Sequence, residues 1–331
     1  MLPPSPLWTA FSPFASYTPI VTSTQPKIWT TRALLTWMGD AFTKNGLDSP
    51  RLMGEMLMSH VLKCDRLKLY MDADRPASAD ERESLRVLVG RALKHEPVQY
   101  LVGEAWFFGL PLRVTPEVLI PRPCTETIIE QVLGHCRAEP GFGGKTGEGV
   151  RFADLCTGSG CIAIALAKNL PQASGIATDI SEAALAVAKA NAEKHKVAER
   201  LEFVHGDLVA PLIEHPSGGG HNLHYLCANP PYIPDSEWND PDGVGLNVRD
   251  FEPEAALRGG ADGLKFVAPI IAQGPARLRP RGVLLIEIAT ATWRAATRLL
   301  REHPLIDPES VRIVKDNDGL ERVVVGVRRA E

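Results

Sequence analysis

Tyr225-Leu226-Cys227-Ala228-Asn229-Pro230-Pro231-Tyr232 is a short apolar run that ends in an asparagine, two prolines and a tyrosine. A run of this kind predicts a buried strand, and each proline fixes its φ at about −65° and stiffens the loop that follows. The Asn229 side-chain carbonyl and the Pro230 backbone carbonyl then offer two acceptors to one planar NH2 group, which can lie on the Tyr232 ring. The alternative is an ordinary proline-rich turn, which many proteins contain.

Strands and helices are predicted to alternate around this stretch, from Val150 to the end of the chain. The predicted strands are 151–155, 174–178, 201–204, 223–228 and 283–288, and the predicted helices are 161–169, 182–195 and 264–278. This alternation is typical of an α/β fold with a doubly wound parallel sheet. Two final strands, at 311–314 and 322–327, lie too close together for a helical crossover, so we expect a Rossmann-like sheet that ends in an antiparallel hairpin.

The N-terminal part of the chain has a helical pattern instead. Apolar residues recur at helical spacing through residues 31–95, which predicts a small helical bundle. Ser49-Pro50 predicts a helix start, with the serine as the N-cap and the proline in the first helical position. Ser78 and Glu81 have the spacing of a capping box. Residues 96–125 mix aromatic and short apolar runs, which predicts a β-hairpin connector.

The chain is therefore predicted to have four parts. These are an extension that we expect to be disordered (1–30), a helical domain for substrate recognition (31–95), a β-hairpin linker (96–125) and a catalytic α/β domain (126–331).

Composition excludes several classes of protein. The net charge of the 331-residue chain is −4, so a broad basic surface for duplex nucleic acid is not indicated. Its six cysteines form no CxxC pairs, which argues against a zinc site and a disulfide framework and favours a reducing, cytoplasmic compartment. No apolar run reaches membrane-spanning length. We expect no metal, no membrane contact and no direct nucleic-acid binding.

A glycine-containing turn follows the first predicted strand of the sheet. It comprises Asp154, Leu155, Cys156, Thr157, Gly158, Ser159 and Gly160, and it opens a helix. Its glycines allow a tight turn and close approach of a ligand to the backbone. Gly158 and Gly160 with Ala163 also fit a dinucleotide-binding turn, so this segment alone leaves the cofactor open. Asp154 favours S-adenosylmethionine, because a carboxylate there can receive the ammonium group of that cofactor.

Two further strand ends complete the predicted cofactor site, since ligands of open α/β sheets bind beyond the carboxyl ends of the strands. Asp179 ends the second strand and can accept both ribose hydroxyls. Asp207 and Leu208 follow the third strand, where the adenine is expected to lie. Asn229 at the fourth strand decides between the two cofactors, because a hydride-transfer enzyme has no need to hold an NH2 group, whereas an amino-methyltransferase does.

With these motifs, the chain resembles the protein-(glutamine-N5) methyltransferases that act on peptide-chain release factors, the HemK/PrmC family. The resemblance runs from about Thr31 to Val327. It is carried, besides Asn229-Pro230-Pro231-Tyr232, by the segments 96–103, 119–126, 249–253 and 259–264. Two departures stand out: Cys124 occupies a position where the family usually has an acid, and Cys156 replaces a common first glycine.

The resemblance implies an activity and its partners. It implies methyl transfer from S-adenosylmethionine to the side-chain nitrogen of the glutamine in the Gly-Gly-Gln motif of class I peptide-chain release factors, by a cytoplasmic monomer. In this scheme Asn229 and Pro230 hold the amide hydrogens, while Tyr232 and the prolines, Pro231 included, exclude water. Catalysis then comes chiefly from positioning, and we name no general base.

Three other functions remain open from the sequence. Residues 156–161 also resemble a sister family that methylates a glutamine of a large-subunit ribosomal protein. A nucleic-acid amino-methyltransferase would use the same pair of carbonyls on a base. The last alternative is a cofactor-binding partner protein without activity, against which the intact Asn229–Tyr232 segment argues.

Overall fold

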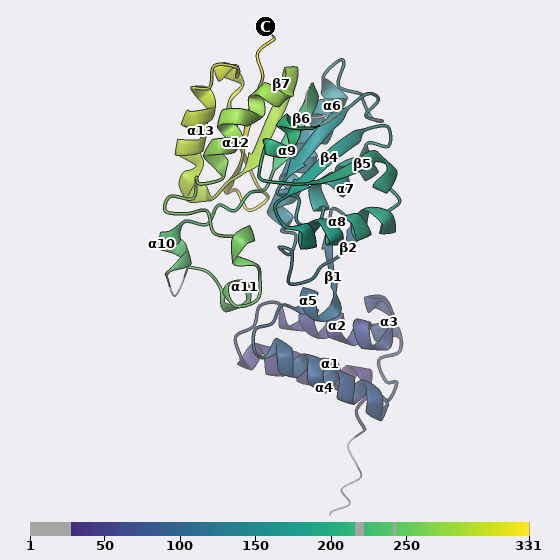
Figure 1. The fold of residues 1–331 in the computed structure, drawn as a ribbon. Helices are drawn as coiled ribbons and strands as arrows, with labels where there is room; N and C mark the ends of the chain where they lie inside the picture. The colour runs from purple at the N-terminus through teal and green to yellow at the C-terminus, as the bar shows by residue number, and fades with distance from the viewer. Residues whose placement is uncertain (1–27, 216–221, 241–242, 331) are drawn as a thin grey trace, which may run out of the picture.

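The computed structural model describes residues 28–215, 222–240 and 243–330. A helical bundle near the N-terminus is joined to a larger α/β part by a small two-stranded sheet (Figure 1). The α/β fold class predicted from the sequence is confirmed. Apart from residues 28–30, the extension predicted at 1–30 lies outside the described residues.

Five helices form the N-terminal bundle: α1 (Thr31–Lys44), α2 (Pro50–Leu62), α3 (Arg66–Met71), α4 (Ala79–Ala92) and α5 (Val98–Val102). The predicted capping box is confirmed, because Ser78 and Glu81 each accept a hydrogen bond from the backbone of the other. Pro50 begins α2 and Ser49 is its N-cap residue, as predicted, but Ser49 lacks the side-chain hydrogen bond that usually accompanies this position. Ser49 has a left-handed φ of 50°, and its hydroxyl makes no capping bond.

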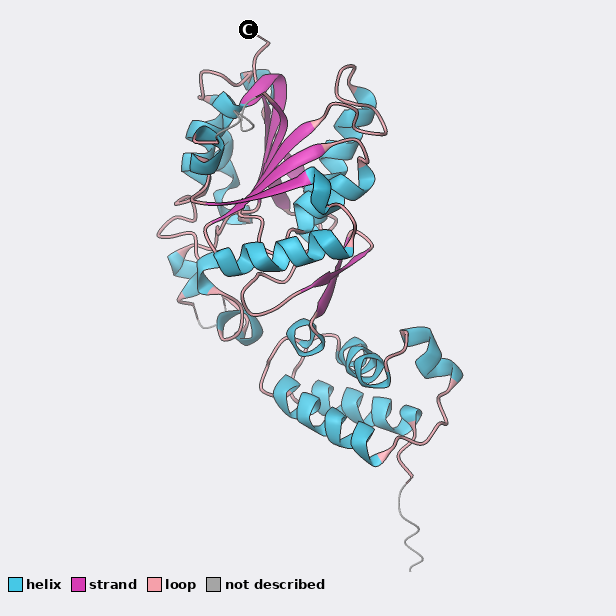
Figure 2. Cartoon of the chain, turned by 45° about the vertical axis from the view of Figure 1, so that its right-hand side comes forward, coloured by secondary structure: helices cyan, strands magenta, loops and turns pink. Residues whose placement is uncertain are grey.

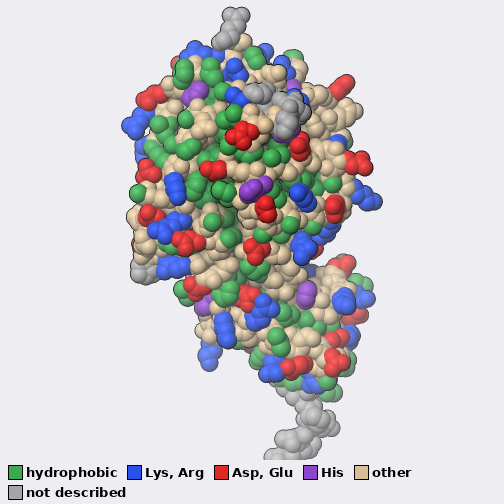
Figure 3. All heavy atoms as spheres, viewed as in Figure 1, with side chains coloured by type: hydrophobic (Ala, Val, Ile, Leu, Met, Phe, Trp, Pro, Cys, Tyr) green, Lys and Arg blue, Asp and Glu red, His purple; other side chains and the backbone are tan. Residues whose placement is uncertain are grey.

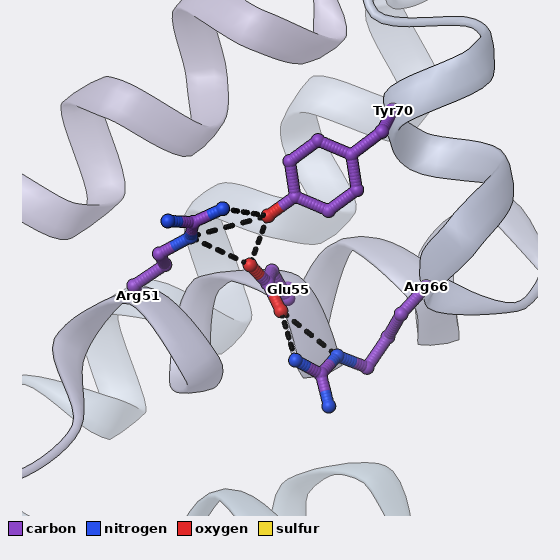
Figure 4. A network of polar contacts seen from close by, with 4 residues as sticks. All are labelled: Arg51, Glu55, Arg66 and Tyr70. Carbon is purple, nitrogen blue, oxygen red and sulfur yellow. Dashed lines mark hydrogen bonds and ion pairs between the residues drawn. The ribbon is translucent and has the colours of Figure 1, made fainter.

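A polar cluster lies between α2 and α3 (Figure 4). The side chain of Glu55 is only 3% exposed, and its carboxylate pairs with Arg51 at 3.0 Å and with Arg66. The Tyr70 hydroxyl donates to the same carboxylate. These contacts tie α3 to α2. Neither α3 nor α5 was predicted from the sequence, because both helices are too short to show a clear period.

The central sheet has seven strands in the order β5-β4-β3-β6-β7-β9-β8. Its strands are β3 (Arg151–Leu155), β4 (Ser174–Asp179), β5 (Leu201–His205), β6 (Leu223–Ala228), β7 (Leu278–Glu287), β8 (Arg312–Lys315) and β9 (Glu321–Val327). Strands β3 to β7 pair in parallel, whereas β9 lies antiparallel between β7 and β8. The predicted terminal hairpin is therefore confirmed.

The largest error in the predicted elements concerns the segment before β7. The helix predicted over 264–278 is shorter, α12 (Val267–Gln273), and a 3-10 turn (Gly274–Arg277) follows it. Pro275 lies in that turn, where its ring and missing N–H oppose continuation of an α-helix. Strand β7 then begins at Leu278, before the predicted start at Val283.

Helices cover both faces of the sheet. On one face lie α6 (Glu126–Ala138), α7 (Cys161–Asn169) and α8 (Glu182–Lys194), and on the other lie α9 (Ala210–Ile213), α12 and α13 (Trp293–Arg301) (Figure 1). Successive residues of β6 alternate between the two cores: Tyr225 packs on the α7 side and Leu226 on the α12 side. Because helices cover both faces of the sheet, polar side chains of its strands can meet a ligand only at the strand ends.

The linker hairpin, β1 (Glu104–Phe107) and β2 (Leu110–Arg113), lies between the bundle and the sheet (Figure 2). Asn191 on α8 anchors it, because its side-chain amide bonds both the N–H of Arg113 (2.7 Å) and its carbonyl (2.9 Å). Two short helices, α10 (Asp235–Trp238) and α11 (Leu246–Arg249), follow β6. Over the described ranges, no helix has both the length and the apolar character needed to cross a membrane.

Candidate active site

A cavity of about 1130 Å³ opens at the carboxyl ends of β3, β4, β5 and β6. The first strand of the sheet in chain order, β3, lies between β4 and β6, so the chain reverses its winding direction there. Such switch points are where open α/β sheets bind ligands. Nine of the residues predicted for the site line this cavity: Cys156, Thr157, Gly158, Ser159, Asp179, Asp207, Leu208, Asn229 and Pro231.

The turn after β3 has the tight geometry that its glycines predict. Gly158 and Gly160 have φ values of 53° and 82°, and a Cβ on Gly160 would lie 2.9 Å from Ile164 Cδ1. Cys156 has a φ of 56°, a left-handed conformation that glycine adopts at little cost. The departure noted at Cys156 therefore falls where the backbone favours glycine.

Asp154 lies beneath this turn and is not part of the cavity wall. It is fully buried, and its Oδ2 accepts hydrogen bonds from the Thr157 hydroxyl (2.6 Å) and the Ala163 N–H (3.1 Å). Its Oδ1 has no hydrogen-bond partner among the described residues. Burial raises the pKa of Asp154 to about 7, and these two hydrogen bonds only partly offset that effect.

The carboxylate of Asp179 is already partly engaged at the end of β4. Its two oxygens accept the N–H groups of Gly158 and Ser181, each at 2.9 Å. Burial raises its pKa. A carboxylate has about four lone-pair sites, so Asp179 retains capacity for hydroxyl donors of a ligand. Asp207 is exposed and borders the same cavity with the partly buried Leu208.

Asn229 follows β6 with a defined side-chain orientation. Its Nδ2 donates to the Thr125 hydroxyl at 3.1 Å, which leaves its carbonyl oxygen for other donors. Pro230 and Pro231 are buried, and Pro231 contacts the main cavity. Tyr232 instead borders a smaller adjoining cavity of about 210 Å³, to which Asn229 also contributes.

Tyr232 ends in a buried cluster around Glu287, the last residue of β7. Its hydroxyl donates to Glu287 Oε1 at 2.8 Å, and the Cys124 thiol donates to the same oxygen at 3.6 Å. Burial raises the pKa of Glu287, an effect that Thr125, Tyr232 and Arg322 reduce but do not cancel. The pKa of Cys124 rises to about 12, chiefly through burial. Thr125 and Glu287 were not among the residues predicted for the site.

An ion pair joins the linker to the loop region after α11. Arg122 contacts Glu252 Oε1 at 2.5 Å, and Glu252 Oε2 accepts the Ile120 N–H at 3.0 Å. The Glu252 side chain is completely buried, so the pair holds segment 120–122 on segment 249–253. Both segments belong to the set that carries the family resemblance. The only indication of this contact in the sequence is that Arg122 and Glu252 carry opposite charges.

Comparison with known proteins gives two family matches. Residues 33–103 match the PrmC N-terminal domain, and residues 145–240 match the methyltransferase small domain.

Relatives with similar sequences share one description. The release factor glutamine methyltransferase of Geobacter sulfurreducens is 37% identical over 302 residues, which cover 91% of this chain and 98% of that protein. The release factor glutamine methyltransferase of Chlorobaculum tepidum is 38% identical and covers 90% of this chain and 97% of its own length. Among solved structures, the hMettl16 catalytic domain in complex with MAT2A 3′UTR hairpin 1 shares the fold. It has a TM-score of 0.50 and 17% identity, and it covers 68% of this chain and 76% of that chain.

Proposed function

Because the chain belongs to the release factor glutamine methyltransferase family, we propose that it methylates the side-chain nitrogen N5 of the Gly-Gly-Gln glutamine in class I peptide-chain release factors. One observation carries this proposal. The NH2 end of Asn229 is held by Thr125, so its carbonyl oxygen is left to accept N–H groups at the wall of the cavity.

The residues of the cavity fit S-adenosylmethionine as methyl donor. Asp179 and Asp207 supply the acceptors that the hydroxyls and exocyclic amine of a nucleoside require. Asp154 lies beneath the turn, outside the cavity wall, and one of its buried oxygens has no partner among the described residues, so this carboxyl group would attract the ammonium group of the cofactor toward the turn. Cys156, Thr157, Gly158, Ser159 and Gly160 would supply the tight turn, and Leu208 an apolar contact. When bound, S-adenosylmethionine supplies an electrophilic methyl group on a positively charged sulfur.

The residues after β6 would prepare the substrate amide. An amide nitrogen is a poor nucleophile, because its lone pair is delocalised into the carbonyl. Two acceptors, Asn229 Oδ1 and the Pro230 carbonyl, would hold both amide hydrogens and so fix the direction of the nitrogen. Such positioning contributes several kcal/mol to lowering a barrier, on the order of 7–11 kcal/mol at best. Pro231 and Tyr232 would restrict the access of water.

The remaining parts of the chain would have supporting roles. We propose that residues 31–95 recognise the release factor, that residues 96–125 link this part to the catalytic domain, and that residues 126–331 carry out the methyl transfer. We also propose that the protein acts as a cytoplasmic monomer and does not bind nucleic acid directly. The net charge of −4 supports the proposed absence of direct nucleic-acid binding. So does the face in Figure 3, on which acidic and basic side chains are interspersed.

The test is transfer of a labelled methyl group to a purified class I release factor, a large-subunit ribosomal protein and nucleic acid, assayed in parallel. We expect label only on the release factor, and none when the glutamine of its Gly-Gly-Gln motif is replaced by alanine. Label on either other substrate instead would overturn the proposed substrate.

The role of Asn229 has its own variant. Asn229→Ala should reduce kcat by about 10³-fold, in the range found when a positioned hydrogen-bonding group is removed from an active site. Binding of S-adenosylmethionine, measured by calorimetry, should be retained. Equal losses of transfer and of cofactor binding would assign Asn229 to the cofactor alone.

A further inference from the structure

A carboxamide that is held by its nitrogen also has an oxygen that needs a donor. In the proposed function, Asn229 Oδ1 and the Pro230 carbonyl accept the two hydrogens of the substrate amide. The carbonyl oxygen of that amide belongs to the same planar group and enters the site beside the buried Pro230 and Pro231. A buried acceptor without a donor costs free energy, so a productive site supplies an N–H or O–H group near Asn229.

Donors are few where the two cavities meet. Among the described residues that line the smaller cavity, of about 210 Å³, three have side chains with N–H or O–H groups. Two of them are engaged, because the NH2 group of Asn229 donates to Thr125 and the hydroxyl of Tyr232 donates to Glu287. The third is Arg122, which lines both this cavity and the main one, as Asn229 does.

We propose that Arg122 donates a hydrogen bond to the carbonyl oxygen of the substrate glutamine side chain, and that Glu252 is the positioning residue that holds Arg122. This inference rests on the proposed function. It gives the two ends of the substrate amide opposite partners: acceptors at Asn229 and Pro230 for the nitrogen, and a donor at Arg122 for the oxygen. A carboxylate has no N–H to offer those acceptors, so the arrangement selects a carboxamide.

The guanidinium group of Arg122 has donors to spare. It carries five N–H groups in a rigid plane. One of them, on Nη2, donates to Glu252 Oε1 at 2.5 Å, and this side chain makes no other hydrogen bond to a described residue. The Arg122 side chain is 30% exposed, whereas that of Glu252 is completely buried. Arg122 is therefore anchored at one nitrogen and retains N–H groups for a ligand.

The position of Arg122 is fixed from two sides. It stands between Pro121 and Pro123, and its φ of −98° and ψ of 142° are the extended conformation that a following proline favours. Its partner is fixed too, because Glu252 Oε2 accepts the Ile120 N–H at 3.0 Å. A donor with so little freedom can hold a substrate group in one orientation.

The 3-10 turn Pro123–Thr125 connects Arg122 to Asn229. The Thr125 N–H donates to the Arg122 carbonyl at 3.1 Å, and the Thr125 hydroxyl accepts from Asn229 Nδ2 at 3.1 Å. One residue thus joins the backbone of Arg122 to the side chain of Asn229. The donor for the substrate oxygen and the acceptor for the substrate nitrogen are therefore placed by the same turn.

The competing ligand for Arg122 is the carboxylate of the cofactor, because Arg122 also lines the main cavity. The smaller cavity favours the substrate. It is lined by Asn229 and Tyr232, but by none of the turn residues 156–160 and neither Asp179 nor Asp207, which are proposed to hold the cofactor.

The experiment measures how strongly the enzyme prefers the glutamine side chain. The Kd of release factor is measured by calorimetry for the native Gly-Gly-Gln motif and for a Gly-Gly-Ala motif, with S-adenosylhomocysteine, the demethylated cofactor, present. Two enzymes are compared, Glu252→Gln alone and Arg122→Ala together with Glu252→Gln. Both carry Glu252→Gln, because alanine at position 122 would otherwise leave a buried carboxylate without its partner.

The preference is the Kd for the alanine motif divided by the Kd for the glutamine motif. We expect it to be about tenfold lower when Arg122 is absent, as for the loss of a hydrogen bond from a charged donor. The kcat/KM for methyl transfer should fall by at least about tenfold for the same reason. The Kd for S-adenosylmethionine should change by less than about twofold.

Arg258→Ala is the matched control. Arg258 also lines the main cavity but not the smaller one, and it pairs with Asp235 at 2.6 Å and Glu254 at 2.7 Å. Its removal also takes an arginine from the cavity wall, yet the preference for glutamine should stay within about twofold of the wild-type value.

The outcomes separate the two proposals. If the wild-type enzyme transfers no methyl to release factor, the proposed function fails. If the wild type is active and the preference is the same with and without Arg122, the contact is refuted. A Kd for S-adenosylmethionine that rises with the loss of Arg122 while the preference is unchanged assigns Arg122 to the cofactor carboxylate and also overturns the proposal.

A second variant covers the case in which the double variant does not fold, as judged by its melting curve. Arg122→Gln can still donate to Glu252, but its side chain is shorter and has a single NH2 group, so the donors that face the cavity are lost. An unchanged preference in Arg122→Gln would refute the role without the double variant.

Discussion

Two buried carboxyl groups each accept a hydrogen bond from a tyrosine, Glu55 in the helical bundle and Glu287 at the end of β7, yet their pKa values move in opposite directions. Burial raises the pKa of Glu55, but Tyr70, Arg66 and Arg51 outweigh it, and the net pKa is lowered. For Glu287 burial prevails, and the net pKa is raised. Direct contact with guanidinium groups marks the difference (Figure 4).

The paired carboxylate of Glu55 stabilises the fold, whereas burial of the Glu287 carboxylate costs free energy of folding. Glu55 is ionised, paired and tied to α2 and α3, so it contributes to the stability of the bundle. Glu287 is completely buried at the end of β7, where the Tyr232 hydroxyl and the Cys124 thiol donate to its carboxylate. Carboxyl groups with raised pKa values are enriched at functional sites. We therefore expect substitutions of Glu55 and of Glu287 to have different effects on the free energy of unfolding.

The largest effect on stability is expected from Glu55→Ala. The variant loses the bonds to Tyr70, Arg51 and Arg66, and we expect the free energy of unfolding to fall by about 2 kcal/mol. This value is at the low end for charged hydrogen bonds because both arginines are largely exposed. Urea unfolding followed by circular dichroism measures it.

Asp74→Ala is the matched control in the same bundle. Asp74 pairs with Arg32 at 3.1 Å, but both side chains are mostly exposed, and we expect little change in stability. Equal losses in the two variants would mean that burial of Glu55 adds nothing to its ion pairs.

A smaller change in the free energy of unfolding is expected when each acid is converted to its amide at pH 8, and the two sites should not change in the same direction. Glu55→Gln should lower the free energy of unfolding by about 1 kcal/mol, because the pairing charge is lost. Glu287→Gln should leave it unchanged or raise it, because an ionised buried carboxyl is replaced by a neutral group. Unfolding midpoints in urea compare them, and a loss of stability in both variants would contradict the distinction.

The dependence of these differences on pH follows from the direction of each pKa shift. The pKa of Glu55 is lowered from 4.5, so its contribution to stability is present above that value and is lost as the pH falls through the folded pKa. The pKa of Glu287 is raised from 4.5, so its contribution is complete below that value and is lost as the pH rises through the folded pKa.

Urea unfolding between pH 3 and pH 8 tests both directions. The deficit of Glu55→Gln relative to the wild type should shrink on acidification below about pH 4. The relative stability of Glu287→Gln should increase from about pH 4.5 upward. If the two variants show parallel pH profiles, the two carboxyl groups do not differ as the structure indicates.

Local patterns predicted most of the fold. Strands β3 and β6 and helix α7 were predicted with the bounds that the structure has, because apolar runs and turn residues mark them within a few positions. The capping box at Ser78 also depends on neighbours three residues apart. Helices α3 and α5 were missed, since one or two turns do not establish a helical period.

The candidate site was only partly predictable, for a related reason. Residues such as Asp179 and Asn229 follow strands, so their place at the sheet edge can be inferred from the pattern. Thr125 and Glu287 meet this site across 104 and more residues of chain, and no local pattern reports such a contact. The burial of Asp154 was missed too, because a carboxylate at this strand end was expected to receive the ammonium group of the cofactor directly.

The smallest effects are expected from relief of backbone strain, which occurs in both regions. Cys156 in the turn after β3 has a φ of 56°, and Ser49 and Lys63, which flank α2, have a φ of 50°. A side chain in this conformation costs about 1–2 kcal/mol relative to the right-handed one, and glycine avoids that cost but gains entropy when unfolded. Glycine at Ser49 or Lys63 should therefore raise the free energy of unfolding by about 0.5–1 kcal/mol.

Cys156→Gly should give a similar gain in stability, and it should also change the Kd for S-adenosylmethionine, because Cys156 lines the main cavity. The two glycine variants in the bundle should leave that Kd unchanged. Calorimetry and urea unfolding of the three variants separate strain from function. If all three behave alike in both measurements, strain in the turn has no bearing on the cofactor. The different pairing of Glu55 and Glu287 would then remain the feature that distinguishes the strand ends from the bundle, since left-handed residues occur in both.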